Sequence, residues 1–288
     1  MTLVSPLARL ILGALMAIAA GTAARVPSAA AETDAKSIQL APHRAIYDLK
    51  LAQARSNRSA QTVSGRILYD FSGNSCDGYA LQFRQVSELD SEEGKAAVSD
   101  LRATTWEDGA GTNFRFNSQN RLNDKPVDTV DGQAQRGTGS VAVNLSKPQP
   151  KKFDIDAGMV FPTEHMRRII AAARDGKTLV ELPVYDGSEN GQKIFNTLSV
   201  IGRPIAPDQR VPTDAAAGQA VLAGLLRWPV TISYFDKLAK EGEQTPTYSI
   251  TFELYENGIS RALLLDYNDF VIKGDMSTLE IKDAKPCH

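Results

Sequence analysis

The side chains that most often carry out chemistry are few in this 288-residue sequence, and they stand far apart. Three histidines are present, His43, His165 and His288. None of them has a second histidine, a cysteine or a carboxylate at a spacing typical of metal ligands. We therefore expect no metal site and no cofactor.

The nearest approach to a serine-hydrolase motif is Gly-Asn-Ser-Cys-Asp-Gly at residues 73–78. This stretch has one residue too many before the second glycine of a Gly-x-Ser-x-Gly motif. It also stands between two apparent strands, whereas a nucleophilic serine of this kind needs a strand-to-helix turn. We interpret the stretch as a polar β-turn that presents Cys76 for pairing.

Carboxylates are the remaining candidates for catalysis. Carboxylates such as Asp154 or Glu164 are the candidates for a hydrolase, an activity that would need two carboxyl groups facing each other about 5–9 Å apart in a cleft. Exposed loop charges are the simpler interpretation of the acidic residues. The sequence thus predicts no catalytic residues, and the hydrolase stays an alternative.

The N-terminus indicates export. Residues 1–31 contain two arginines, no acidic residue, and an apolar run at residues 10–20 that is too short to span a bilayer as a helix. This pattern is typical of a signal peptide. The small residues 29–31 predict cleavage after Ala31, with Ala24 as the alternative. The expected mature protein is one domain over residues 32–288, located in the periplasm.

The only two cysteines are Cys76 and Cys287. An oxidising compartment and an even cysteine count favour a disulfide bond between them. Two unpaired buried thiols are the alternative. The bond would hold the C-terminal segment, which normally frays, on an early strand.

The net charge argues against binding of nucleic acid or an anionic membrane, and the hydropathy argues against a membrane-spanning helix in the mature chain. Cleavage removes Arg9 and Arg25, so the formal net charge changes from −2 to −4. This mild negative charge gives no electrostatic basis for binding nucleic acid or an anionic membrane. No second apolar stretch approaches the roughly 18 residues that a membrane-spanning helix needs.

Alternation of apolar and polar residues predicts that the mature chain is mostly β, as at residues 45–51, 63–71 and 79–83. Such alternation is typical of an antiparallel sheet with one apolar face. Asn257-Gly258 predicts a hairpin between strands 248–255 and 259–267. Gly274-Asp275 predicts a join between two short strands, 270–273 and 278–281. About fourteen strands in one sheet must curl, split or close.

Residues 161–176 predict the one clear helix, with Pro162 in its first turn and Gly176 at its end. Its apolar stripe either packs on the sheet or lines a hydrophobic cup for an apolar ligand. The stripe consists of Met166, Ile169, Ile170 and Ala173. Three arginines, Arg167, Arg168 and Arg174, are predicted to form a solvated face.

A second, weaker helix is predicted at residues 214–226, where Asp214 stands in position to cap an Ala- and Leu-rich stretch. Gly218 and Gly224 weaken this prediction. The fold class expected from these patterns is a large curled antiparallel sheet with one or two short helices.

Three features occur in an order that resembles a known family. They are Phe-Pro-Thr-Glu-His-Met at residues 161–166, Trp-Pro-Val-Thr-Ile-Ser-Tyr-Phe-Asp at residues 228–236, and the pair Cys76 and Cys287. Together they resemble the EipB-like periplasmic cell-envelope integrity proteins, an exported family long grouped as a domain of unknown function. The resemblance covers nearly all of the mature chain.

The resemblance implies a spiral-like, many-stranded sheet with a cup, similar to the half-barrel lipoprotein carriers. It implies a disulfide at Cys76 and Cys287, a role in the integrity of the Gram-negative envelope and no established enzymatic activity. We therefore predict a periplasmic, non-catalytic scaffold or binding protein. Its expected partners are other periplasmic or envelope proteins, for example a helical-repeat protein, and a lipid or acyl ligand. The alternatives are a carrier of lipid or lipoprotein acyl chains and a hydrolase that acts on envelope polymers through carboxylates such as Asp154 or Glu164.

Overall fold

The computed structural model describes residues 33–55, 62–90, 96–237, 245–284 and 287. The predicted signal peptide and both of its predicted cleavage sites lie outside these residues. None of the helices in the described part of the chain has the length and hydrophobicity needed to cross a bilayer.

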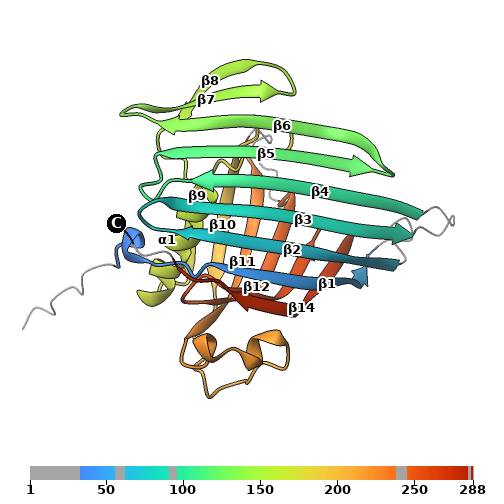
Figure 1. Cartoon of the computed structure of the whole chain (residues 1–288), viewed down its shortest axis with the longest axis vertical. Coiled ribbons are helices and arrows are strands. Elements are labelled where there is room, and N and C mark those ends of the chain that lie inside the picture. The colour runs from blue at the N-terminus through green and yellow to red at the C-terminus, as the bar shows by residue number, and fades with distance from the viewer. Residues whose placement is uncertain (1–32, 56–61, 91–95, 238–244, 285–286, 288) are drawn as a thin grey trace, which may run out of the picture. The chain divides into compact units, whose positions relative to one another are not determined.

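Fourteen strands of the described chain form one antiparallel sheet (Figure 1). The first eight strands are β1 (His43–Ala54), β2 (Thr62–Asn74), β3 (Gly78–Asp90), β4 (Ala96–Glu107), β5 (Asn113–Leu122), β6 (Lys125–Arg136), β7 (Ser140–Lys147) and β8 (Lys151–Asp156). The other six are β9 (Leu179–Val184), β10 (Phe195–Ile201), β11 (Arg227–Asp236), β12 (Tyr248–Tyr255), β13 (Ser260–Asp266) and β14 (Phe270–Ile281). The predicted fold class, mostly β with a large antiparallel sheet, is confirmed.

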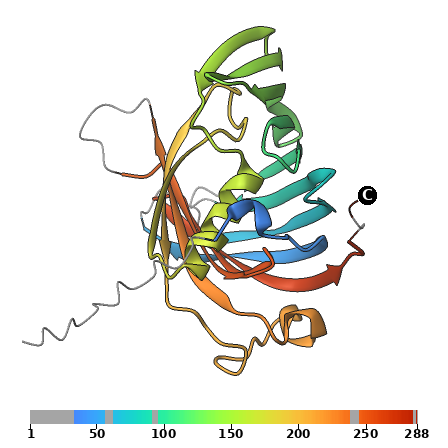
Figure 2. The same ribbon diagram turned by 90° about the vertical axis from the view of Figure 1, so that its left-hand side faces the viewer.

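The sheet consists of two meanders joined in the middle. Its order is β8-β7-β6-β5-β4-β3-β2-β1-β14-β13-β12-β11-β10-β9, so the first and last strands are neighbours. At this join His43 pairs with Ile281 and Ala54 with Phe270. The two meanders face each other in Figure 2, with the helix α1 (Pro162–Arg174) between them.

The sheet does not close through its edge strands, β8 and β9. The segment between β8 and α1 instead forms a parallel bridge to β9 at Val160 and Val184. The Val160 amide donates to the Pro183 carbonyl at 2.9 Å, and the Tyr185 amide donates to the Val160 carbonyl at 3.0 Å. This bridge covers part of an edge that would otherwise present unpaired backbone groups.

Inward-facing residues form two core clusters. The larger one joins β1, β2 and β10–β14 to α1, whose Ile169 and Ile170 are fully buried. The smaller one lies under β5–β8, where Phe114 stacks on Phe161 with ring centroids 5.1 Å apart. Helix α1 begins after Phe161 with proline in its first turn, as predicted. It is followed by Gly176 at φ +73°, a conformation that glycine adopts without strain.

Two local predictions are wrong. The stretch 214–226 contains only the short 3₁₀ turns η2 (Ala215–Gly218) and η3 (Ala220–Leu222), because Gly218 ends the first turn and Gly224 stands shortly after the second. The two predicted strands on either side of Gly274 are a single strand, β14. A side chain on Gly274 would lie 3.2 Å from both Leu49 and Leu263, so this glycine permits close packing rather than a turn.

The predicted disulfide bond is present between Cys76 and Cys287, with their Cα atoms 5.6 Å apart. Cys76 lies in the tight turn between β2 and β3, as the sequence predicts. The Asn74 side-chain carbonyl accepts hydrogen bonds from the amides of Cys76 and Asp77 at 2.8 and 2.7 Å. This arrangement is the Asx turn typical of asparagine.

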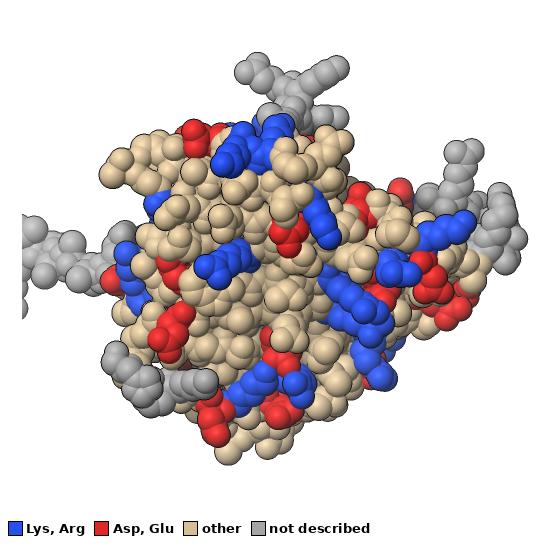
Figure 3. All heavy atoms as spheres, turned by 45° about the horizontal axis from the view of Figure 1, so that its top comes forward, with Lys and Arg blue, Asp and Glu red and all other residues tan. Residues whose placement is uncertain are grey.

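The outer surface carries charges of both signs close together. Figure 3 shows basic and acidic side chains side by side around a broad uncharged area. On β3 and β4, for example, Asp100 pairs with Arg84 at 2.9 Å and with Arg102 at 2.8 Å. On the face shown, no large region of one sign is visible, in keeping with the small net charge.

Candidate functional site: a cavity between helix α1 and the sheet

A cavity of about 230 Å³ lies between α1 and the inner face of the sheet. Helix α1 contributes His165 and Met166 to its lining, and the first meander contributes an aromatic wall. In that wall the ring of His43 stacks on Tyr69 at 5.4 Å, and Tyr69 stacks on Phe71 at 6.1 Å. The cavity therefore has helix α1 on one side and strands β1 and β2 on another.

The second meander lines the cavity from β11, with Ile232 and Tyr234. Asp186, in the loop that follows β9, adds the only carboxylate among the lining residues. The ring of Tyr234 stacks on Tyr248 at 4.4 Å and meets Phe195 edge to face at 5.6 Å. These contacts hold Tyr234 in a rigid aromatic cluster.

Only one of the four predicted cup residues reaches this cavity. Met166 lines it, whereas Ile169, Ile170 and Ala173 are buried in the larger core cluster. The N-terminal half of α1 thus faces the cavity and the C-terminal half packs on the sheet. The lining residues that were not predicted include His43, Tyr69, Phe71, Tyr234 and Asp186. The signal for the first four was the alternation that places side chains of β1, β2 and β11 on the inner face, whereas Asp186 lies in a loop and had no such signal.

The hydrogen bonds of His165 fix its tautomer. The Thr197 hydroxyl donates its single proton to the Leu182 carbonyl at 2.8 Å, because a carbonyl can only accept. The same oxygen lies 3.2 Å from His165 Nε2, so Nε2 carries the proton and donates. Burial lowers the pKa of His165 to about 4, and nearby Arg168 acts in the same direction. His165 is therefore neutral at pH 7.

His43 is held in the opposite tautomer. Its Nδ1 donates to the Ala41 carbonyl at 2.8 Å, so Nε2 is unprotonated in the neutral ring. Burial lowers the pKa of His43, in part against the effect of the Ala41 hydrogen bond. The third histidine, His288, lies outside the described residues.

Burial raises the pKa of Asp186, although the Ser188 side chain and backbone favour the charged carboxylate. The Ser188 amide donates to Asp186 Oδ1 at 2.9 Å. Burial likewise raises the pKa of Tyr69 to about 12. The ionisable groups that face the cavity are thus all shifted toward their neutral forms.

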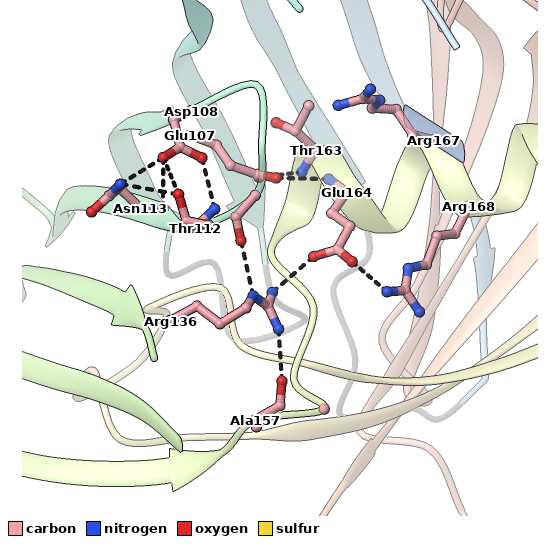
Figure 4. A network of polar contacts seen from close by, with 12 residues as sticks. Glu107, Asp108, Thr112, Asn113, Arg136, Ala157, Thr163, Glu164, Arg167 and Arg168 are labelled. Carbon is pink, nitrogen blue, oxygen red and sulfur yellow. Dashed lines mark hydrogen bonds and ion pairs between the residues drawn. The ribbon is translucent and has the colours of Figure 1, made fainter. Parts of the chain in front are cut away.

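The first turn of α1 is capped by a side chain from a distant strand (Figure 4). Glu107, at the end of β4, accepts the amide protons of Thr163 at 2.7 Å and Glu164 at 2.9 Å. A carboxylate here satisfies free helix amides and complements the helix dipole. Glu107 is nevertheless 3% exposed, and burial raises its pKa to about 7.

Arg136 joins three chain segments beside this cap (Figure 4). Its guanidinium donates to Glu164 at 2.8 Å, to the Gly111 carbonyl at 3.0 Å and to the Ala157 carbonyl at 2.7 Å. It also lies 5.1 Å from the ring centre of Phe161. The start of α1 is thereby fixed to β6 and to the loops after β4 and β8.

One of the three arginines predicted to be solvated is buried. Arg167 is 5% exposed and donates to the carbonyls of Ala35, at 3.0 Å, Gly109, at 3.1 Å, and Lys36. The planar guanidinium can donate to several carbonyls at once. Helical periodicity predicts only the face on which Arg167 lies, so these contacts with distant carbonyls could not be predicted. Arg168 and Arg174 are partly exposed, as predicted.

The two carboxylates of the hydrolase alternative lie in different surroundings. Glu164 forms ion pairs with Arg136 at 2.8 Å and with Arg168 at 2.5 Å. Asp154 is exposed on β8 and lines a separate, open pocket of about 490 Å³ over β5–β8, whose lining does not include Glu164. Glu164 therefore serves to hold the start of α1 in place.

Comparison with known proteins assigns the chain to a family. The model of the EipB-like family matches residues 34–283. The cell envelope integrity protein EipB of Brucella abortus (strain 2308) is 37% identical over 256 residues, which cover 89% of each chain. A crystal structure of a beta-barrel-like protein of domain of unknown function DUF1849 from Brucella abortus has a TM-score of 0.79 and 36% identity. The match covers 86% of this chain and all of that one. The family predicted from the sequence is confirmed: this chain belongs to the EipB-like family.

Proposed function

We propose that this protein is exported to the periplasm, where its single domain supports the integrity of the cell envelope by binding rather than by catalysis. The observation that carries the proposal is the 37% identity to the cell envelope integrity protein EipB over 89% of both chains. The partners expected in this role are other envelope proteins.

The engagement of the polar side chains around α1 supports a binding role. His165 donates to Thr197, Glu107 accepts from two helix amides, and Glu164 pairs with two arginines. Each of these groups has a structural partner that would have to be given up before it could act on a substrate. We propose the cavity beside Met166 as the binding site.

A deletion strain tests this function. Without the protein, cells are expected to become sensitive to detergents and to antibiotics that act on the envelope, and the full-length gene should restore resistance. A gene lacking codons 2–31 should fail to restore it, because the protein then stays in the cytoplasm. Normal resistance in the deletion strain, or full rescue by the truncated gene, would contradict the proposal.

A carrier of acyl chains is the second candidate, favoured by the apolar side chains Met166, Phe71 and Ile232 in the cavity. Ligand pockets usually enclose about 300–1,000 Å³, and the cavity here is about 230 Å³. A whole acyl chain would therefore require α1 to move away from the sheet. Stoichiometric acyl lipid in organic extracts of the protein purified from its periplasm would support this candidate.

A further inference from the structure

We infer that the cavity between α1 and the sheet is a site for a small, neutral ring molecule with a hydrogen-bonding group, of the class of phenol or indole. This inference rests on the proposed function, because it names the ligand class for the same cavity. Four properties of the cavity carry it: its size, its walls, its free polar groups and its lack of a fixed cationic side chain.

The volume of the cavity limits the size of the ligand. A cavity of about 150 Å³ in another protein accommodates benzene. The cavity here measures about 230 Å³, which adds room for a substituent or a second fused ring. A long acyl chain exceeds this space with α1 in its observed position.

The walls favour a flat molecule. His43, Tyr69 and Phe71 follow one another on neighbouring strands as a stack, with interplanar angles of 23° and 24° for the Tyr69 pairs. Tyr234 lines the cavity from the other meander. Aromatic rings prefer offset-stacked or edge-to-face contacts with such walls. Met166, which also lines the cavity, adapts its shape and makes favourable sulfur contacts with rings.

The polar groups in the cavity favour a ligand with hydrogen-bonding capacity. The Tyr69 and Tyr234 side chains are half-buried beside the cavity, and neither hydroxyl has a hydrogen-bond partner among the described residues. His43 Nε2 can accept a hydrogen bond, since Nδ1 carries the ring proton. A pure hydrocarbon would leave these groups unpaired, which costs affinity. A phenolic hydroxyl or an indole N–H would pair with one or more of them.

The absence of lysine and arginine from the cavity lining argues against a negatively charged ligand. A carboxylate that entered this cavity would lose its hydration without gaining a cationic partner, which is costly. Asp186 would in addition repel it whenever the Asp186 side chain is ionised. Benzoate should therefore bind much more weakly than phenol, although the two are similar in size.

The experiment is calorimetric titration of the full-length gene product, purified from the periplasm, with phenol, indole, toluene, benzoate and decanoate at pH 7. Phenol and indole should bind to one site per chain. Toluene and benzoate should each bind at least about tenfold more weakly, because toluene lacks the hydrogen bond and benzoate carries a charge.

Three conservative variants separate the hydroxyl contribution from packing. At least one of Tyr69→Phe and Tyr234→Phe should weaken phenol or indole binding by about fivefold, the value expected for one hydrogen bond, while toluene binding stays unchanged. Tyr47→Phe is the matched control. Tyr47 is more deeply buried than either cavity tyrosine, but its hydroxyl already donates to the Ser260 carbonyl at 2.7 Å, and it does not line the cavity. This variant should bind the probes like the parent.

Any of three results would overturn the inference. The first is tighter binding of decanoate than of phenol and indole, which would identify an acyl site. The second is phenol and indole affinity that neither cavity variant changes. The third is no binding of either probe to protein that circular dichroism shows to be folded. The deletion strain decides the envelope role separately, so these results leave the proposed function in place.

Discussion

Glu107 and His165, two buried side chains at the start of α1, change the stability of the fold in opposite directions as pH varies. Glu107 has a folded-state pKa of about 7, above its ordinary 4.5, and His165 one of about 4, below its ordinary 6.5. Between about pH 4.5 and 6.5 the folded protein holds a proton on Glu107 that the unfolded chain releases. Over the same range the unfolded chain holds a proton on His165 that the folded protein lacks. Their effects on the free energy of unfolding therefore largely cancel.

Glu107→Gln removes one of the two titrating groups, so the pH dependence of stability that is due to His165 remains in the variant. The stabilising contribution of Glu107 is complete below about pH 4.5 and is lost as pH rises to about 7. The stability difference, parent minus variant, should thus fall across this range by as much as about 3 kcal/mol. Urea denaturation at half-unit pH steps measures it. A constant difference would show that the pKa of Glu107 is ordinary.

His165→Gln should show the opposite trend, since glutamine can still donate to Thr197 but does not titrate. The contribution of neutral His165 is complete above about pH 6.5 and is lost as pH falls toward 4. The stability difference between parent and variant should therefore rise with pH. The same titration tests this result, and a difference that falls with pH would contradict it.

At the scale of elements, the orientation of α1 depends on its contacts with segments far from it in the sequence. Arg167 joins α1 to the short 3₁₀ helix η1 (Ala35–Ser37) and to the loop after β4. Arg167→Lys keeps the charge but cannot reach three carbonyls in different directions. It should lower the free energy of unfolding by about 2 kcal/mol, since hydrogen bonds from a buried charge are among the stronger ones.

Arg168→Lys on the next position of α1 is the matched control. Its pair with Glu164 is partly exposed, at 44% of the arginine side chain, so the expected loss is below about 0.5 kcal/mol. Urea denaturation of both variants at pH 7 gives the comparison. Equal losses would mean that the contacts of Arg167 to Ala35, Lys36 and Gly109 contribute no more stability than an exposed ion pair.

Elements with a regular pattern could be predicted from the sequence, because burial of one face imposes the period. The hairpin at Asn257-Gly258 and the helix after Phe161 are examples, and the structure contains both. Gly274 was misread, because a glycine in a strand can mark either a turn or a close contact, and only the neighbours Leu49 and Leu263 decide. The cup that the stripe of α1 suggested has Met166 in its lining, but the rest of the lining could not be predicted, since His43 and Tyr234 are 191 positions apart and meet only through the strand order. The burial of Arg167 could not be predicted either, since the carbonyls of Ala35 and Gly109 that it contacts are far from it in the sequence.

At the scale of the whole molecule, the disulfide connects the turn after β2 to a segment 211 positions later. Replacing both Cys76 and Cys287 by serine should lower the melting temperature and raise protease sensitivity while leaving the fold unchanged. The chain-entropy model gives a loss of about 5 kcal/mol for a loop of this size. Calorimetry and limited proteolysis measure the effect. A double variant that melts like the parent would show that the bond contributes no stability.

The pairing of β1 with β14 has a further consequence for connectivity. The order of strands in space, read from β9 to β14 and on from β1 to β8, is a cyclic rotation of their order in the sequence. A circular permutant that opens the chain between Gly176 and Lys177 and joins the natural ends by a flexible linker would turn the one distant strand pairing into a local one. We expect it to form the same sheet and to refold faster than the parent, because its contact order is lower. The first and last strands thus lie at the centre of the sheet, and the connection between α1 and β9 is where a functional chain could begin.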